Sequence, residues 1–140
     1  MATEMRNRFR QQGVTLVELI LTIVIVGILS SIAYPKFSQY LQQSRRSEAH
    51  SALIQIANLQ EQFFLQKQRY ASLSELGLKT FPDNSHTTEN DYYRITVTVA
   101  SGSYRLTAMA INAQIHDTEC QLFTLAQDGS RDSSSHERCW

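Results

Sequence analysis

A long apolar segment directly after a short basic stretch constrains this 140-residue chain more than any other feature. Residues 14–34 carry one charge, on Glu18, and are long enough to cross the roughly 30 Å hydrocarbon core of a membrane as a helix. The positive-inside rule keeps the basic end in the cytoplasm, and three arginines precede the segment: Arg6, Arg8 and Arg10. We therefore expect one membrane span, with everything after it on the far side.

The carboxylate of Glu18 is the unusual part of this segment. On insertion scales, a charge in the middle of a spanning helix costs roughly 2.5–3.5 kcal/mol, and less near an end. A plain signal anchor explains the apolar run and the arginines but gives Glu18 no role. A secretory signal peptide is a second interpretation, because Ser31 and Ala33 suit a cleavage site, but such peptides have an apolar core of only about 7–15 residues.

The junction Gly13-Val14-Thr15-Leu16-Val17-Glu18-Leu19 resembles the cleavage site of type IV prepilins. In that family a basic leader is removed after the glycine, and a membrane peptidase N-methylates the new first residue. The resemblance implies cleavage between Gly13 and Val14, methylation of Val14, and a leader over residues 1–13. The family's glutamate at mature position five and proline at position twenty-two correspond to Glu18 and Pro35. Family members most often begin with Phe rather than Val, but cleavage depends mainly on the glycine.

Composition agrees with one small domain joined to an anchor. The 13 basic and 13 acidic residues balance, so no overall basic excess indicates nucleic acid binding. Cys120 and Cys139 both lie in the part expected outside the cytoplasm, where an even pair is most simply a disulfide. Closing a loop of about twenty residues should stabilise the fold by roughly 3 kcal/mol in the chain-entropy model.

Helical periodicity continues past the apolar segment. Apolar residues recur every three or four positions from Ala49 to Phe64, with polar residues between them, which predicts an amphipathic helix. We expect one helix over about residues 16–66. It should be kinked near Pro35, because proline removes a backbone donor and clashes with the preceding turn, and Gly27 is a second point where it can loosen.

The part of the chain that follows the long helix is predicted to form a small antiparallel sheet. Alternating apolar and polar residues predict strands over about 92–99, 104–111 and 120–126. Ser72 and Glu75 have capping-box spacing, which predicts a short helix ending at Gly77. The three strands have one apolar face to bury, and the stripe on the long helix offers the matching surface.

Two further motifs resemble minor pilins of the PilE-like group. The first is Cys120-Gln121-Leu122-Phe123-Thr124-Leu125, followed by Asp128-Gly129 and Cys139-Trp140. The second is Arg45-Arg46-Ser47-Glu48-Ala49, followed by Gln60-Glu61 and Tyr70. The resemblance implies the α+β type IV pilin fold. In that fold a long N-terminal helix, membrane-spanning then amphipathic, packs on a three- to four-stranded antiparallel sheet with a disulfide-bounded C-terminal loop. The resemblance also divides the chain into a leader over residues 1–13, a transmembrane and assembly segment over 14–34, and a globular domain over 35–140.

No catalytic, cofactor or metal site is predicted. The histidines lack metal-ligand spacing and are interpreted as separate surface residues: His50, His86, His116 and His136. The cysteines lack CxxC spacing, and no glycine-rich phosphate loop is present. The acidic stretch from Asp128 to Asp132 is interpreted as a turn rather than a calcium site. A signal-anchored periplasmic enzyme is therefore the least supported interpretation.

The resemblance implies a non-enzymatic filament subunit for adhesion, twitching motility or DNA uptake. It would wait in the inner membrane with a cytoplasmic N-terminus, then leave it for a filament that crosses the periplasm to the cell exterior. The implied partners are the prepilin peptidase, major and minor pilins and the inner-membrane assembly machinery. Within the filament, Glu18 would pair with the amine of a neighbouring subunit, which neutralises two costly charges.

Two related interpretations stay open. A type II secretion pseudopilin shares the N-terminus and fold, but its typical major form has a calcium-binding loop and lacks this cysteine pair. A DNA-uptake pilin would use basic and aromatic residues on the loop or the strands. Arg131, Arg138 and Trp140 lie together, but Asp132 and Glu137 dilute their attraction for phosphate, so DNA is a possible partner that the sequence does not favour.

Overall fold

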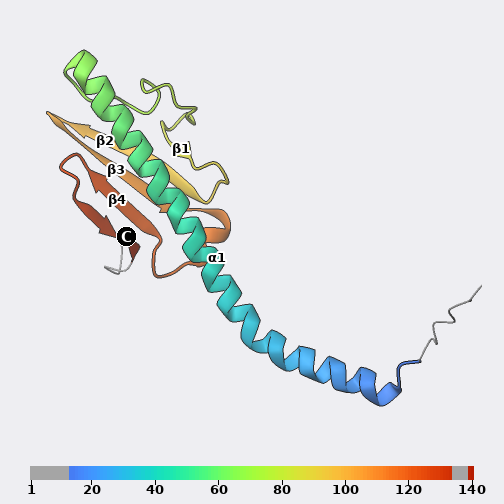
Figure 1. Ribbon diagram of the computed structural model, residues 1–140. Coiled ribbons are helices and arrows are strands. Elements are labelled where there is room, and N and C mark those ends of the chain that lie inside the picture. Colours follow the sequence, from blue (N-terminus) through green and yellow to red (C-terminus); the bar gives the residue numbers. More distant parts are fainter. Residues whose placement is uncertain (1–12, 134–138) are drawn as a thin grey trace, which may run out of the picture. The chain divides into compact units, whose positions relative to one another are not determined.

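One helix dominates the computed structural model, which describes residues 13–133 and 139–140 (Figure 1). Helix α1 runs over Leu16–Lys67, so the single helix predicted from about residue 16 to about 66 is confirmed. Pro35 lies inside it. The chain divides into two compact units, Met1–Ser38 and Gln39–Trp140, and α1 contributes to both. Residues 1–12 of the predicted leader and residues 134–138, including His136, Glu137 and Arg138, lie outside the described part.

The second unit pairs the later part of α1 with a five-stranded antiparallel sheet of order β1-β2-β3-β4-β5. The strands are β1 His86–Thr87, β2 Tyr93–Ala100, β3 Ser103–Ala110, β4 Leu122–Ala126 and β5 Arg131–Ser133. Each strand pairs with the next one in the chain, as short connections favour. Figure 1 shows α1 crossing one face of the sheet. The three predicted strands are therefore confirmed, and two short edge strands extend them.

The core lies between α1 and this face of the sheet. The helix contributes residues spaced by three or four positions, as the amphipathic pattern predicts: Ala49, Leu53, Ile56 and Gln60. Alternate strand residues meet them, with Tyr93 and Ile95 from β2, Leu106 and Ala108 from β3, and Phe123 from β4 fully buried. The opposite face of the sheet is left to solvent or to a partner.

The short helix predicted over 72–77 is wrong, because the chain forms only a turn there. The capping hydrogen bonds are present: the Ser72 amide donates to the Glu75 carboxylate over 2.9 Å, and the Glu75 amide donates to the Ser72 hydroxyl over 3.4 Å. Gly77 follows two residues later with φ of 79°, a left-handed conformation that ends helices. The chain therefore turns away before a second helical turn forms.

A 3₁₀ helix that the sequence did not predict, η1, spans Asn112–His116 between β3 and β4. Asn112 begins it with φ of 51°, which asparagine tolerates better than most residues. The segment places Gln114 and Asp117 in the interior beside α1.

Candidate functional site

The first part of α1 begins with a hydrogen-bonded cap. The Glu18 amide donates to the Thr15 hydroxyl over 3.3 Å, so Thr15 satisfies one of the free donors at the start of the helix. Glu18 thus occupies the third helical position, where a carboxylate is favoured by the positive end of the helix dipole. Gly13 and Val14, the residues of the predicted cleavage site, are both exposed in front of this cap.

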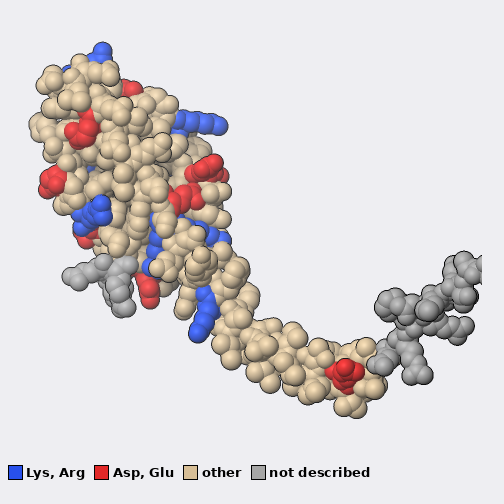
Figure 2. All heavy atoms as spheres, in the orientation of Figure 1, with Lys and Arg blue, Asp and Glu red and all other residues tan. Residues whose placement is uncertain are grey.

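The side chains of residues 14–34 contact no core of their own. No residue in the most apolar 18-residue window of this part of α1 is buried, and by length and composition the helix is able to cross a membrane. Two of its hydroxyl groups bond within the helix, that of Thr22 to the Glu18 carbonyl over 2.6 Å and that of Ser31 to the Ile28 carbonyl over 2.7 Å. In Figure 2 this stretch is uncharged apart from one acidic group.

The predicted disulfide is present in the second unit. Cys120 and Cys139 are bonded, with their Cα atoms 5.6 Å apart, and both residues are buried. The bridge closes the segment that contains β4 and β5. Asp128 and Asp132 each accept a hydrogen bond from the backbone amide of a nearby serine, Ser130 and Ser133 respectively, as expected of turns.

Trp140 is held by several contacts of its ring. The His50 ring stacks on it with a centroid separation of 4.7 Å and an interplanar angle of 9°, and the Arg131 guanidinium lies 5.0 Å from its centroid. The indole Nε1 donates to the Asp132 carbonyl over 2.8 Å, and Phe123 meets the ring edge-on. Trp140 therefore has a structural role at the end of the disulfide-bounded loop, and its half-exposed ring also lines a polar hollow.

His50 is not the surface residue that the sequence analysis expected. Its ring is packed between Trp140 and Phe123, and its buried Nε2 atom has no hydrogen-bond partner among the described residues. Burial lowers the pKa of His50, and the nearby guanidinium groups of Arg131 and Arg46 lower it further. A hydrogen bond with the backbone of Cys139 opposes this shift. His50 thus links α1 to the disulfide-bounded loop.

The charged residues of the Arg45-Arg46-Ser47-Glu48-Ala49 motif fasten α1 to two segments of the second unit, the connection before β2 and the segment after η1. Arg46 binds the buried Asp117 carboxylate through Nε and Nη2, each over 2.6 Å, and this contact raises the pKa of Arg46. The Glu48 carboxylate accepts hydrogen bonds of 3.0 and 2.9 Å from the Asn90 amide and side chain. The Arg45 guanidinium lies 4.4 Å from the centroid of the Tyr92 ring. The motif therefore has a structural role.

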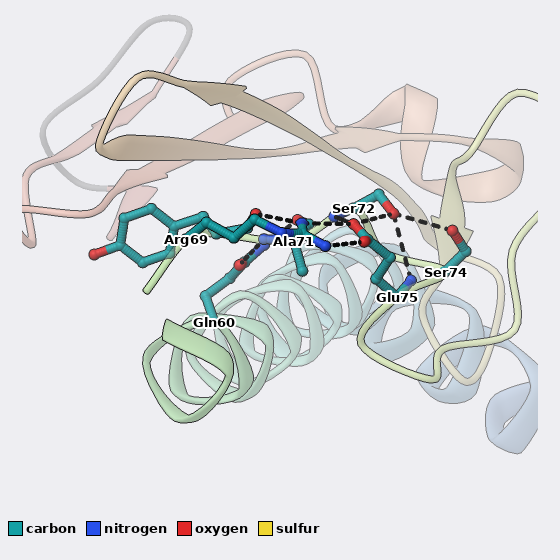
Figure 3. Close-up of polar contacts among 7 residues, drawn as sticks. Gln60, Arg69, Ala71, Ser72, Ser74 and Glu75 are labelled. Atoms are coloured by element: carbon teal, nitrogen blue, oxygen red, sulfur yellow. Dashed lines mark hydrogen bonds and ion pairs between the residues drawn. The ribbon is translucent and has the colours of Figure 1, made fainter. Parts of the chain in front are cut away.

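A separate polar cluster fixes the loop after α1 (Figure 3). The buried Gln60 side chain donates to the Ala71 carbonyl over 2.7 Å and accepts from the Ala71 amide over 2.9 Å. The Arg69 guanidinium binds the Glu75 carboxylate over 2.6 Å. Arg69 and the Ser72 hydrogen bonds together lower the pKa of Glu75 to about 2. The loop is thus ordered by polar contacts at its start.

A hollow of about 830 Å³ in the second unit is polar and contains side chains of both charges. It lies beside the Arg46–Asp117 pair, and its lining includes His116, Glu119 and Trp140. Among residues 13–133 and 139–140, no three histidine, cysteine or acidic side chains are grouped closely enough to hold a metal ion.

Comparison with known families identifies the chain. Residues 8–34 match the model of the prokaryotic N-terminal methylation motif. Residues 35–124 match the model described as type IV minor pilin ComP, DNA uptake sequence receptor, and this match covers more than half of the 140 residues. The chain belongs to the type IV minor pilin family. This family is one of structural pilins.

Relatives of the minor pilin include pilins and pseudopilins. The type IV major pilin protein PilA of Myxococcus xanthus (strain DK1622) is 39% identical over 69 residues, 49% of this chain and 31% of PilA. The type II secretion system core protein G of Pectobacterium carotovorum subsp. carotovorum is 34% identical over 74 residues, 53% of this chain and 47% of that protein. The chain thus spans a third to a half of these relatives. The core protein G of Klebsiella pneumoniae is 27% identical over 139 residues, 94% of this chain and 95% of that protein.

A solved structure supports the fold of the minor pilin. The type IV pilin from Shewanella oneidensis aligns with a TM-score of 0.52 and 21% identity, and the alignment covers 71% of this chain and 97% of that one. The predicted pilin fold is confirmed: a long helix with an apolar first part, packed on an antiparallel sheet with the Cys120–Cys139 bridge.

Sequence reasoning missed the buried polar residues that position the loops. Gln60 had a detectable signal, because it continues the stripe of Ala49, Leu53 and Ile56, and a glutamine on a core face needs hydrogen-bond partners. Asp117 had no detectable signal in the sequence, since its partner Arg46 lies 71 residues earlier in the chain.

Proposed function

We propose that this minor pilin is cut between Gly13 and Val14 by a prepilin peptidase, N-methylated on Val14, and assembled into a type IV filament. The observation that carries the proposal is the start of α1: an exposed apolar helix with a threonine cap, Glu18 in its first turn, and the methylation motif matched over residues 8–34. Residues 1–13 are the leader, 14–34 the membrane and assembly segment, and 35–140 the globular domain.

Assembly follows from the electrostatics of this helix end. Cleavage frees the amine of Val14, a cation at the end of an apolar helix, and Glu18 is the only acidic group in the segment. Both charges are costly in hydrocarbon, and pairing between the amine of one subunit and Glu18 of the next neutralises them together. The apolar side chains exchange lipid for neighbouring helices, so their burial is retained. Pro35 allows α1 to bend at the boundary of the membrane, because it supplies no backbone donor there.

The expected locations and partners follow from the same steps. The precursor spans the inner membrane once with a cytoplasmic N-terminus and meets the prepilin peptidase there. The inner-membrane assembly machinery then transfers it to a filament that reaches the cell exterior, where major and minor pilins are its neighbours. The relatives that are pilins and fimbrial proteins support these partners.

The processing step is tested by a bulky replacement at the cleavage site. Gly13→Val should block maturation, because the peptidase acts on the peptide bond that follows a glycine. Gly27→Val is the matched control, since a side chain at position 27 meets nothing within 4 Å, and its product should be processed normally. Mass spectrometry of the wild-type protein should show an N-methylated Val14. A mature protein beginning at another residue contradicts the proposal.

A second candidate function, DNA binding, is favoured by one observation. The family model that matches residues 35–124 is described as a DNA uptake sequence receptor. The full mature chain in detergent should then bind a labelled DNA duplex, with an affinity that falls as salt rises. Fluorescence anisotropy over a salt series measures this, and binding no stronger than that of an unrelated neutral membrane protein excludes the candidate.

A further inference from the structure

One edge of strand β2 is covered along only part of its length. The short strand β1 pairs with β2 at Arg94 and Ile95, whereas β2 continues to Ala100. Within the described part of the chain, no hydrogen bond joins residues 97–100 to a segment other than β3. We define residues 97–100 as the open edge of the sheet. Val97 is half-exposed there, and the residues that follow it are exposed.

The backbone groups of Val97 and Val99 point out of the sheet at the open edge. The Thr88 amide donates to the Tyr93 carbonyl over 2.9 Å, so the backbone of Tyr93 faces the side on which β1 lies. Every second residue of a strand directs its amide and carbonyl to the same side, which places those of Val97 and Val99 on this side as well. Backbone groups in this position require water or another strand as their partner.

The open edge lacks the features by which proteins usually prevent strands from pairing, namely charged residues, proline and bulges. The sequence from Thr96 to Ala100 is Thr-Val-Thr-Val-Ala, and the register with β3 is continuous through it. At the other end of the sheet, β5 contains the charged residues Arg131 and Asp132. The β2 end of the sheet is therefore better suited to an added strand than the β5 end.

The open edge is complementary to itself. When two copies pair antiparallel about Thr98, Val97 of one copy lies opposite Val99 of the other, and each outward amide meets a carbonyl. The valines then contact each other on one face of the sheet, and the two Thr98 side chains meet on the other face. Cross-strand pairs of β-branched residues stabilise antiparallel sheets. Arg105, which neighbours Thr98 on β3, lies about 14 Å from its counterpart at three strand separations, beyond the screening length of about 10 Å at 0.1 M salt.

Strand β1 limits which chain can fill the open edge. A long extended peptide would continue past Thr96 into the position beside Ile95, which His86 of β1 occupies. In the self-paired register, Ala100 of the second copy lies opposite Thr96, and its chain then turns back into β3. The length of the second copy's strand therefore matches that of the open edge.

We propose that the open edge of β2 pairs antiparallel with the same edge of a second copy, about a two-fold axis at Thr98, so that the two sheets join into one. This contact closes after two copies, so it is separate from the repeating contacts that build a filament. It is also independent of the processing and DNA-binding proposals above. The paired segments are short and bury less than the roughly 1,000 Å² of a stable interface, so the association is weak and acts where copies are concentrated.

Cross-linking through single cysteines tests the register in the full mature chain in detergent. The native cysteines are bonded to each other, so Thr98→Cys introduces a free thiol. In the proposed pair the two Cα atoms at position 98 lie about 4.5 Å apart, which suits a disulfide. Thr96→Cys is the matched control on the same face of β2, because its two Cα atoms would lie about 14 Å apart. Under mild oxidation, Thr98→Cys should dimerise at least about tenfold faster, since a bridge cannot span more than about 7 Å between Cα atoms.

A proline variant tests the hydrogen bonds of the open edge. Val99→Pro removes an amide that points out of the sheet, a position where strands tolerate proline, and should abolish the cross-link of Thr98→Cys. Unchanged Trp140 fluorescence shows that the second unit keeps its fold, and the cysteine comparison decides alone if the fold is lost. Equal cross-linking at positions 96 and 98, or a cross-link that survives Val99→Pro in the folded protein, overturns the proposal. A Thr98→Cys protein that stays monomeric also overturns it, including the case in which the edge takes up a strand of a different protein.

Discussion

The two parts of helix α1 are built from the same backbone but differ in what covers them. From Ala49 to Gln60, one stripe of the helix is buried by the sheet, and charged residues beside the stripe bind segments of the same chain. From Val14 to Tyr34 the side chains are exposed, although nearly all are apolar. Burying such surface is the dominant favourable term in folding and association, so the first part requires a partner outside the chain. We propose that lipid and neighbouring pilin helices supply this partner in turn.

The largest difference between the two parts should appear when one leucine is truncated in each. Leu53→Ala removes a side chain that is 0% exposed and should lower the free energy of unfolding of the second unit by about 2–5 kcal/mol. Leu21→Ala removes one that is 57% exposed and should leave that free energy unchanged. Chemical denaturation of the full mature chain in detergent, followed by Trp140 fluorescence, measures both. Equal losses contradict the distinction.

Within the second unit, removal of the disulfide should separate the stability of the C-terminal tail from that of α1, β2 and β3. Cys139→Ser should cost about 3 kcal/mol, since the bridge closes a loop whose tail is rich in polar residues. The loss should be confined to residues from about Ser130 onward, while α1, β2 and β3 persist. Hydrogen exchange should show lost protection only in that tail. If protection also falls across β2 and β3, or if both thiols react freely in the native protein, the loop is held in another way.

A smaller, pH-dependent effect is expected at His50. Because its pKa is lowered in the folded state, the unfolded chain binds a proton more readily as pH falls through about 6.5. The free energy of unfolding should therefore decrease below neutral pH until the lowered folded pKa is reached. His50→Phe keeps an aromatic ring against Trp140 and should flatten this dependence. His116→Gln, at an exposed histidine, should keep the wild-type profile, and a loss of pH dependence in this control instead would refute the assignment.

The sequence predicted most of the fold because its signals are local and periodic. The long helix, the strands over residues 93–100, 103–110 and 122–126, and the cysteine pair all follow from spacing and compartment. At residues 72–77 the sequence predicts a helix from the capping-box spacing of Ser72 and Glu75, and the same capping hydrogen bonds form in the turn that is found there. The Arg46–Asp117 and His50–Trp140 contacts join residues far apart in the chain, so no local pattern could indicate them.

The central claim is that the exposed first part of α1 is completed by neighbouring subunits through Glu18. Glu18→Val removes the only acidic group of the segment and should leave cleavage and membrane insertion intact, while incorporation into filaments falls strongly. Shearing of surface filaments followed by immunoblotting measures incorporation against the membrane-held pool. An enlarged membrane pool with little sheared protein is the predicted result. Normal incorporation of Glu18→Val would contradict the account.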